Sequence, residues 1–127
     1  MPEINYLTRI IFDSGAVAQT GDLLAARGLT RPMVVTDAGI VAAGLVARLM
    51  DALPSEAVVF DGTPPNPTES AVHDALALFR QNDCDALVAI GGGSSIDLAK
   101  GVGLLATHPA PLAQYAAIDG GIARIAK

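Results

Sequence analysis

The stretch from Ala86 to Ser95, Ala-Leu-Val-Ala-Ile-Gly-Gly-Gly-Ser-Ser, decides the fold of this chain. Its first five residues form a short apolar run, which is typical of a strand buried on both faces. Three glycines follow, and they favour a tight turn. The spacing of Ile96, Leu98, Val102 and Leu105 then predicts a helix. The stretch therefore predicts a strand, a turn and a helix in immediate succession.

Strands and helices alternate in the same way along the rest of the chain. Apolar runs predict strands at 7–12, 32–36 and 57–60, and apolar spacing predicts helices at 16–27, 40–53 and 69–82. Thr68 is the expected N-cap of the last of these helices. Because the connections are short, we expect an α/β fold, a Rossmann-like parallel sheet with helices on both faces. The tail at 113–127 shows no element of its own.

The composition agrees with one compact domain. The chain has 127 residues, of which 51% are hydrophobic and 17% charged, a balance far from that of disordered chains. A net charge of -5 without a basic stripe argues against nucleic acid as a partner. No apolar run reaches the roughly 18 residues of a membrane span. The single cysteine, Cys84, can form no internal disulfide, so we expect a reducing compartment and a cytoplasmic protein without a membrane partner.

The turn at Gly91, Gly92 and Gly93 has the chemistry of an anion site. Backbone N–H groups and the positive end of a helix dipole meet where a strand passes through glycines into a helix. The hydroxyls of Ser94 and Ser95 add donors or cap the helix, and Asp97 is a further candidate for the cap. The alternative is a tight turn with ordinary capping. Neither the usual dinucleotide fingerprint, which needs a glycine where Ile96 stands, nor the P-loop pattern matches.

The whole string from Gly91 to Lys100, Gly-Gly-Gly-Ser-Ser-Ile-Asp-Leu-Ala-Lys, resembles the signature of the iron-containing (group III, metal-dependent) alcohol dehydrogenases. Pro65–Thr68 resembles the Pro-Asn-Pro-Thr loop of that family. Val34–Asp37 resembles the strand end that carries its cofactor-discriminating position. The resemblance covers nearly all of the chain, in the same order and spacing. It implies the N-terminal domain of a dehydroquinate synthase-like fold.

The resemblance implies a cofactor site made of nine residues. It assigns the cofactor pyrophosphate to Gly91, Gly92, Gly93, Ser94 and Ser95, a cofactor contact to Asn66, the adenosine ribose to Asp37, and the rest of the signature to Asp97 and Lys100.

Two of these assignments have structural alternatives. A carboxylate at 37 accepts hydrogen bonds from a ribose diol and repels a 2′-phosphate, so it favours NAD over NADP. Asp37 could instead cap a turn. Asp97 and Lys100, at i and i+3, could form a surface ion pair.

The resemblance also implies a divalent metal, iron or zinc, held by one Asp and three His in a helical second domain. This chain has only His73 and His108, so we expect it to supply neither metal ligands nor catalytic residues. We therefore expect residues 1–127 to be the NAD-binding domain of a longer enzyme and to be inactive alone. The C-terminal metal-binding domain is then absent from this chain. A free-standing, non-catalytic nucleotide-binding module is the alternative.

For the parent protein, the resemblance implies an NAD-dependent, metal-dependent oxidoreductase that interconverts a small alcohol and its aldehyde or ketone. The runner-up is an enzyme similar to glycerol dehydrogenase or dehydroquinate synthase, whose signatures diverge after the glycines. A homo-oligomer is expected, because the strand at 7–12 could pair across subunits if its edge is exposed.

Overall fold

The computed structural model describes residues 11–53 and 56–108. Its elements, in chain order, are the 3₁₀-helix η1 (Ala16–Gln19), α1 (Thr20–Ala26), β1 (Pro32–Val35), α2 (Ala38–Ala42), α3 (Leu45–Asp51), β2 (Val58–Phe60), α4 (Glu69–Gln81), β3 (Ala86–Ala89) and α5 (Gly93–Thr107). Of the strand expected at 7–12, only Ile11 and Phe12 are described, and neither lies in a strand. The tail at 113–127 lies outside the described residues.

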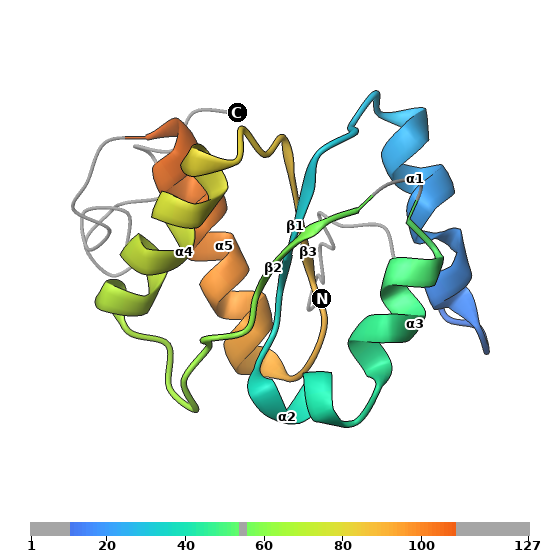
Figure 1. Ribbon diagram of the computed structural model, residues 1–127, viewed down its shortest axis with the longest axis horizontal. Helices are drawn as coiled ribbons and strands as arrows, with labels where there is room; N and C mark the ends of the chain where they lie inside the picture. Colours follow the sequence, from blue (N-terminus) through green and yellow to red (C-terminus); the bar gives the residue numbers. More distant parts are fainter. Residues whose placement is uncertain (1–10, 54–55, 109–127) are drawn as a thin grey trace, which may run out of the picture.

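The three strands form one parallel sheet in the order β2-β1-β3. In its register Met33 of β1 pairs with Val58 on one side and with Leu87 on the other. Figure 1 shows α4 and α5 on one face of this sheet and α1 and α3 on the opposite face. The predicted α/β fold, a parallel sheet covered by helices on both faces, is confirmed.

The two faces of β1 supply two separate parts of the core. Met33 and Val35 are fully buried in the cluster formed with α4 and α5, which includes Val72, Leu98 and Val102. Val34 points to the opposite cluster, whose other buried members are Leu24, Leu49, Leu53 and Ala86. Successive strand residues point to opposite faces, so one short strand of four residues anchors both layers.

The helix expected at 40–53 is wrong in one respect, because the structure has two helices there. Gly44 adopts a left-handed conformation with φ +79° between α2 and α3, which ends the first helix. The short helix α2 carries no buried residue, and Val41 remains 41% exposed. A second correction applies at 16–27, where the first four residues are 3₁₀ and only Thr20–Ala26 is α-helical.

The topology fixes where a ligand can enter. The connection from β1 to β2 runs through α2 and α3, whereas the connection from β2 to β3 runs through α4 on the other face. The helix after β3, α5, packs on the same face of the sheet as α4. The chain therefore leaves β1 and β3 toward opposite faces of the sheet. Open α/β sheets bind ligands in the crevice that opens at the carboxyl ends of the strands at such a point.

Candidate functional site

A cleft of about 380 Å³ lies at the carboxyl ends of all three strands. Three loops line it, and they follow β1, β2 and β3. Its residues are Asp37, Ala38, Gly39, Thr63, Pro64, Pro65, Gly92, Gly93 and Ser94. The cleft thus lies at the crevice that the topology predicts, and four of the nine predicted site residues line it.

The floor of the cleft includes the N-terminus of α5. Gly92 is the N-cap, and it has no side chain to occupy the first N–H groups. Its carbonyl accepts the first helical hydrogen bond, from the Ile96 N–H at 3.4 Å. The N–H groups of Gly93, Ser94 and Ser95 have no carbonyl within the helix to donate to. Together with the positive end of the helix dipole, they form a place suited to an anion.

Of the two roles considered for the serines, donating to a ligand or capping the helix, the capping role is wrong, and so is the cap considered for Asp97. Because α5 already begins at Gly93, Ser94, Ser95 and Asp97 all lie inside it, past the position at which a cap can act. The missing cap leaves the first turn open toward the cleft.

The three glycines differ in what they allow. Gly91 has φ +140°, and a Cβ added there would lie 3.3 Å from Ser95 Oγ and 3.4 Å from Ile40 Cγ1. A Cβ on Gly92 or Gly93 would meet nothing within 4 Å. Gly91 is therefore required by the turn itself, whereas Gly92 and Gly93 keep the cleft open at its floor.

The two serines of the signature point in different directions. The Ser94 hydroxyl donates to the carbonyl oxygen of Pro65, in the loop after β2. Ser95 is 1% exposed, and its hydroxyl has no hydrogen-bond partner among the described residues. Of the two side chains, only that of Ser94 reaches another wall of the cleft.

Asp37 takes part in the wall formed by the loop after β1. Its Oδ1 accepts a hydrogen bond of 3.0 Å from the Ile40 N–H, so Asp37 is the N-cap of α2. The turn-capping alternative is therefore present in the structure. It uses one carboxylate oxygen, and the half-buried side chain still lines the cleft. Capping holds the carboxylate at this wall and leaves its second oxygen available to a ligand.

The remaining predicted residues lie farther from the lining. Asn66 is exposed and follows Pro65, a lining residue. Asp97 and Lys100 are exposed on α5 and do not line the cleft. The surface ion pair considered for them does not form, since the ion pairs among the described residues are Arg31–Asp85 and His73–Glu69.

Several residues of the cleft were not predicted from the sequence. Thr63, Pro64 and Gly39 line it, although no motif marked them. The hydroxyl of Thr63, like that of Thr36 at the end of β1, is buried and lacks a partner within the described residues. Backbone pairing brings the two residues together, because the Thr63 N–H donates to the Thr36 carbonyl at 3.4 Å. The one available signal was that each of them lies within four positions of the carboxyl end of a strand.

The described residues do not fit a metal ion. No group of three or more His, Cys, Asp or Glu side chains gathers in the described parts of the chain. His73 Nε2 lies 3.9 Å from Glu69 Oε1 on α4, and His108 Nδ1 lies 3.1 Å from the Leu104 carbonyl oxygen at the end of α5. Neither histidine belongs to a ligand set there.

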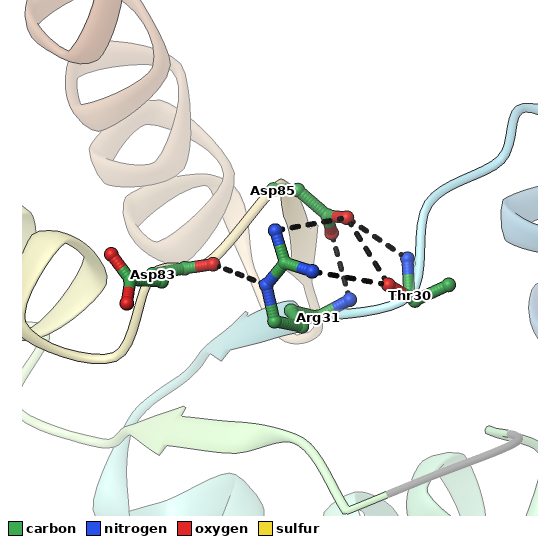
Figure 2. Close-up of polar contacts among 4 residues, drawn as sticks. All are labelled: Thr30, Arg31, Asp83 and Asp85. Carbon is green, nitrogen blue, oxygen red and sulfur yellow. Dashed lines mark hydrogen bonds and ion pairs between the residues drawn. The ribbon is translucent and has the colours of Figure 1, made fainter.

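A polar cluster centred on Asp85 closes the opposite, amino-terminal edge of the sheet (Figure 2). The Asp85 carboxylate accepts from the Thr30 N–H at 3.0 Å and from the Arg31 N–H at 2.8 Å. Arg31 also donates through Nε to the Asp83 carbonyl at 2.6 Å. The Thr30 N–H above all, helped by the Arg31 N–H and guanidinium, holds the pKa of Asp85 below its ordinary value of 3.8.

Cys84 lies beside this cluster and lines a second cleft, of about 410 Å³. Burial, and then the neighbouring Asp85 carboxylate, raises the pKa of the Cys84 thiol. A raised pKa leaves little of the reactive thiolate, which agrees with a structural role for this residue.

No helix within residues 11–53 and 56–108 is long and apolar enough to cross a membrane.

The fold and the cleft define a class of protein, namely α/β domains with a cleft at the carboxyl edge of a parallel sheet. Residues 8–126 match the iron-containing alcohol dehydrogenase family, and the chain belongs to that family.

Known relatives are similar over most of this chain. The 4-hydroxybutyrate dehydrogenase of Cupriavidus necator is 52% identical over 126 residues, which are 98% of this chain and 33% of that protein. The crystal structure of a 1,3-propanediol oxidoreductase has a TM-score of 0.77 at 39% identity and covers 80% of this chain and 28% of its own. Sulfoacetaldehyde reductase from Bifidobacterium kashiwanohense, solved in complex with NAD+, has a TM-score of 0.73 at 31% identity, over 80% of this chain and 27% of its own.

The chain therefore spans about a third or less of the length of these relatives.

Proposed function

We propose that residues 1–127 form the nucleotide-binding domain of an oxidoreductase and that the cleft at the carboxyl edge of the sheet binds NAD. The observation that carries this proposal is the uncapped start of α5, whose free N–H groups open into a cleft shared with the Asp37 carboxylate. An N-terminus of this kind stabilises the charge of a pyrophosphate through short hydrogen bonds and the helix dipole. The complex of the related sulfoacetaldehyde reductase with NAD+ supports the same ligand.

Asp37 is the residue proposed to distinguish the two nicotinamide cofactors. Its carboxylate is held at the wall of the cleft by the Ile40 N–H. A ribose diol donates hydrogen bonds to such a carboxylate, whereas a 2′-phosphate brings a second negative charge close to it. We therefore propose NAD as the cofactor in preference to NADP.

We further propose that the complete protein interconverts a small alcohol and its aldehyde or ketone. Support comes from family membership and from the 4-hydroxybutyrate dehydrogenase at 52% identity. Because the described residues offer no metal site, residues outside them are proposed to hold the metal and to carry out the chemical step. The 127-residue chain alone is then expected to bind NAD without oxidising an alcohol.

A titration of the purified chain with NAD and with NADP tests the proposal. We expect NAD to bind at least about tenfold more tightly than NADP, a difference of about 1.4 kcal/mol. The variants Asp37→Ser and Asp37→Asn keep an N-cap for α2 and remove the charge. They are expected to lose most of the preference for NAD. Asp74→Asn, an exposed carboxylate on α4 outside the cleft lining, is the matched control for the lost charge and should keep it.

Two results would contradict these assignments. A folded chain that binds neither nucleotide excludes the proposed site. A preference for NAD that survives in both Asp37 variants removes Asp37 from the discrimination and leaves the site itself standing.

A further inference from the structure

The hydroxyl of Ser94 links two walls of the cleft. Ser94 lies half-buried in the first turn of α5, and its hydroxyl donates to the carbonyl oxygen of Pro65, 29 positions away in the sequence. Both residues line the cleft. A side-chain hydrogen bond thus joins the anion-binding helix start to the loop after β2.

Ser94 has two hydrogen-bond donors, its hydroxyl and its backbone N–H, and only the hydroxyl is used by the loop. A serine hydroxyl can donate one hydrogen bond, and here the carbonyl oxygen of Pro65 accepts it. A phosphate oxygen needs a donor, which the hydroxyl cannot supply while it holds the loop. The Ser94 backbone N–H has no partner within α5 and remains available to an anion. Ser94 can therefore serve a phosphate through its main chain and the loop through its side chain at once.

The loop after β2 is held at both of its ends as well. The Thr63 N–H donates to the Thr36 carbonyl at 3.4 Å, and the Thr68 hydroxyl accepts from the Ala71 N–H at 3.1 Å, as the predicted cap of α4. Asn66 lies between the Pro65 and Thr68 anchor points and is exposed. Pro64, Pro65 and Pro67 restrict the backbone around it. Among these anchors, the bond between Ser94 and Pro65 is the one next to Asn66 in the sequence.

We propose that Ser94 is a positioning residue: its hydroxyl holds Pro65 so that the Asn66 amide reaches the bound nucleotide, while its backbone N–H contributes to the phosphate site. This inference rests on the proposed binding of NAD. It separates the side chain of Ser94 from the phosphates, although the sequence signature groups them together.

A double-mutant cycle on the 127-residue chain tests the inference. NAD affinity is measured for wild type, Ser94→Ala, Asn66→Ala and the double variant. We expect Ser94→Ala to weaken NAD binding about threefold to tenfold, the range for one neutral hydrogen bond. In the Asn66→Ala background the same change should cost less than about twofold, because the two residues then act as one unit. Ser94→Thr keeps the hydroxyl and should restore binding to within about twofold of wild type.

Inorganic pyrophosphate, used as a competitor against NAD, probes the phosphate site alone. Its affinity should be the same in wild type and Ser94→Ala, because the backbone N–H groups remain. Thr20→Ala is the matched control, since Thr20 Oγ1 also donates to a backbone carbonyl, that of Val17 at 2.7 Å, and neither residue lines the cleft. It should leave both affinities unchanged, and thermal unfolding of each variant verifies that it is folded.

Several results would overturn the inference. Equal losses from Ser94→Ala in both backgrounds, or wild-type affinity in Asn66→Ala, show that Ser94 does not act through Asn66. A matching loss of pyrophosphate affinity shows that the hydroxyl binds phosphate directly. Failure of the wild-type chain to bind NAD removes the proposed function and this inference with it, and it is seen before any variant is made.

Discussion

At the scale of single residues, Gly91 and Gly93 of the signature differ in their backbone conformation and in the space around them. Gly91 has a left-handed φ of +140° and close neighbours on two sides, whereas Gly93 has neither. A sequence motif would treat the two glycines alike. The structure indicates that the turn requires Gly91, and we propose that Gly93 leaves room for the ligand.

Two alanine substitutions should therefore have opposite effects. Gly91→Ala is expected to destabilise the chain by about 1 to 3 kcal/mol, because it forces a strained backbone conformation. Gly93→Ala lies in helical backbone with open space around it and should leave stability unchanged or raise it by up to about 1 kcal/mol. The added methyl group should nevertheless weaken NAD binding by about tenfold or more, as an extra carbon in a fitted site does.

Thermal unfolding and NAD titration on the same two samples measure both effects. If Gly93→Ala bound NAD as wild type does, Gly93 would have no part in admitting the ligand. If Gly91→Ala were as stable as wild type, the strain assigned to its φ would be absent.

The site could be predicted from the sequence where it depends on local order along the chain. Gly92, Gly93 and Ser94 follow β3 within a few positions, and Asp37 follows β1, so their convergence follows from the parallel sheet. The hydrogen-bond partners of the side chains were harder to predict from the sequence. The partner of the Ser94 hydroxyl is a loop carbonyl, and no periodicity in the sequence points to such a bond.

At the scale of elements, β1, β2 and β3 were predicted closely, whereas the helices expected at 40–53 and 16–27 both needed correction. β1 is buried along its whole length and β2 and β3 are at least half-buried, and such short apolar runs are visible in the sequence. In the helix expected at 40–53, Val41 and Leu45 have helical spacing, yet they are 41% and 40% exposed. Spacing alone does not reveal that Gly44 turns left-handed and redirects the chain.

The Asp85 cluster is an element-scale feature that local patterns also miss. Its carboxylate holds the chain before β1 from a position 54 and 55 residues later, at the start of β3. It thereby fixes two neighbouring strands at the same edge (Figure 2). Only the folded sheet brings these residues together.

Asp85→Asn should lower the Tm by several degrees at neutral pH, because it removes the charge that the Thr30 and Arg31 N–H groups bind. The sign of the pH dependence follows from the lowered pKa of Asp85. The ionised carboxylate favours the folded state, so its contribution is complete above the ordinary pKa of 3.8 and is lost as the pH falls through the lower folded value. The Tm difference from wild type should be constant from pH 6 to 8, to about 1 °C, and shrink below about pH 4.

Thermal unfolding as a function of pH, with Asp74→Asn as the exposed control, measures this difference. A gap between wild type and Asp85→Asn that widened on acidification would contradict the assignment.

At the scale of the whole molecule, the proposed binding cleft is built on all three strands. Its walls come from the loops after β1, β2 and β3, and both core clusters support those strands. A ligand that bridges these loops binds the folded chain and finds no site in the unfolded one. Binding should therefore stabilise the entire domain.

NAD at 100 times its dissociation constant should stabilise the chain by about 2.7 kcal/mol. For a domain of this size that corresponds to a Tm increase on the order of 10 °C. NADP at the same concentration should produce a clearly smaller shift, and Gly93→Ala should reduce the NAD shift. Thermal melts over a series of NAD concentrations provide the measurement. A Tm independent of NAD concentration would contradict binding to the folded state.

The central position of β1 has a consequence for synthesis of the chain on the ribosome. This strand is made first of the three, yet Met33 gains its two partners only when Val58 and then Leu87 have emerged. Until then its apolar residues have no sheet to enter, and the growing chain exposes a segment that nascent-chain chaperones recognise by its apolar character. The last wall of the cleft, Gly92 to Ser94, emerges later still. A nascent chain from which α5 has not yet emerged thus lacks both the last wall of the cleft and the core residues Leu98 and Val102.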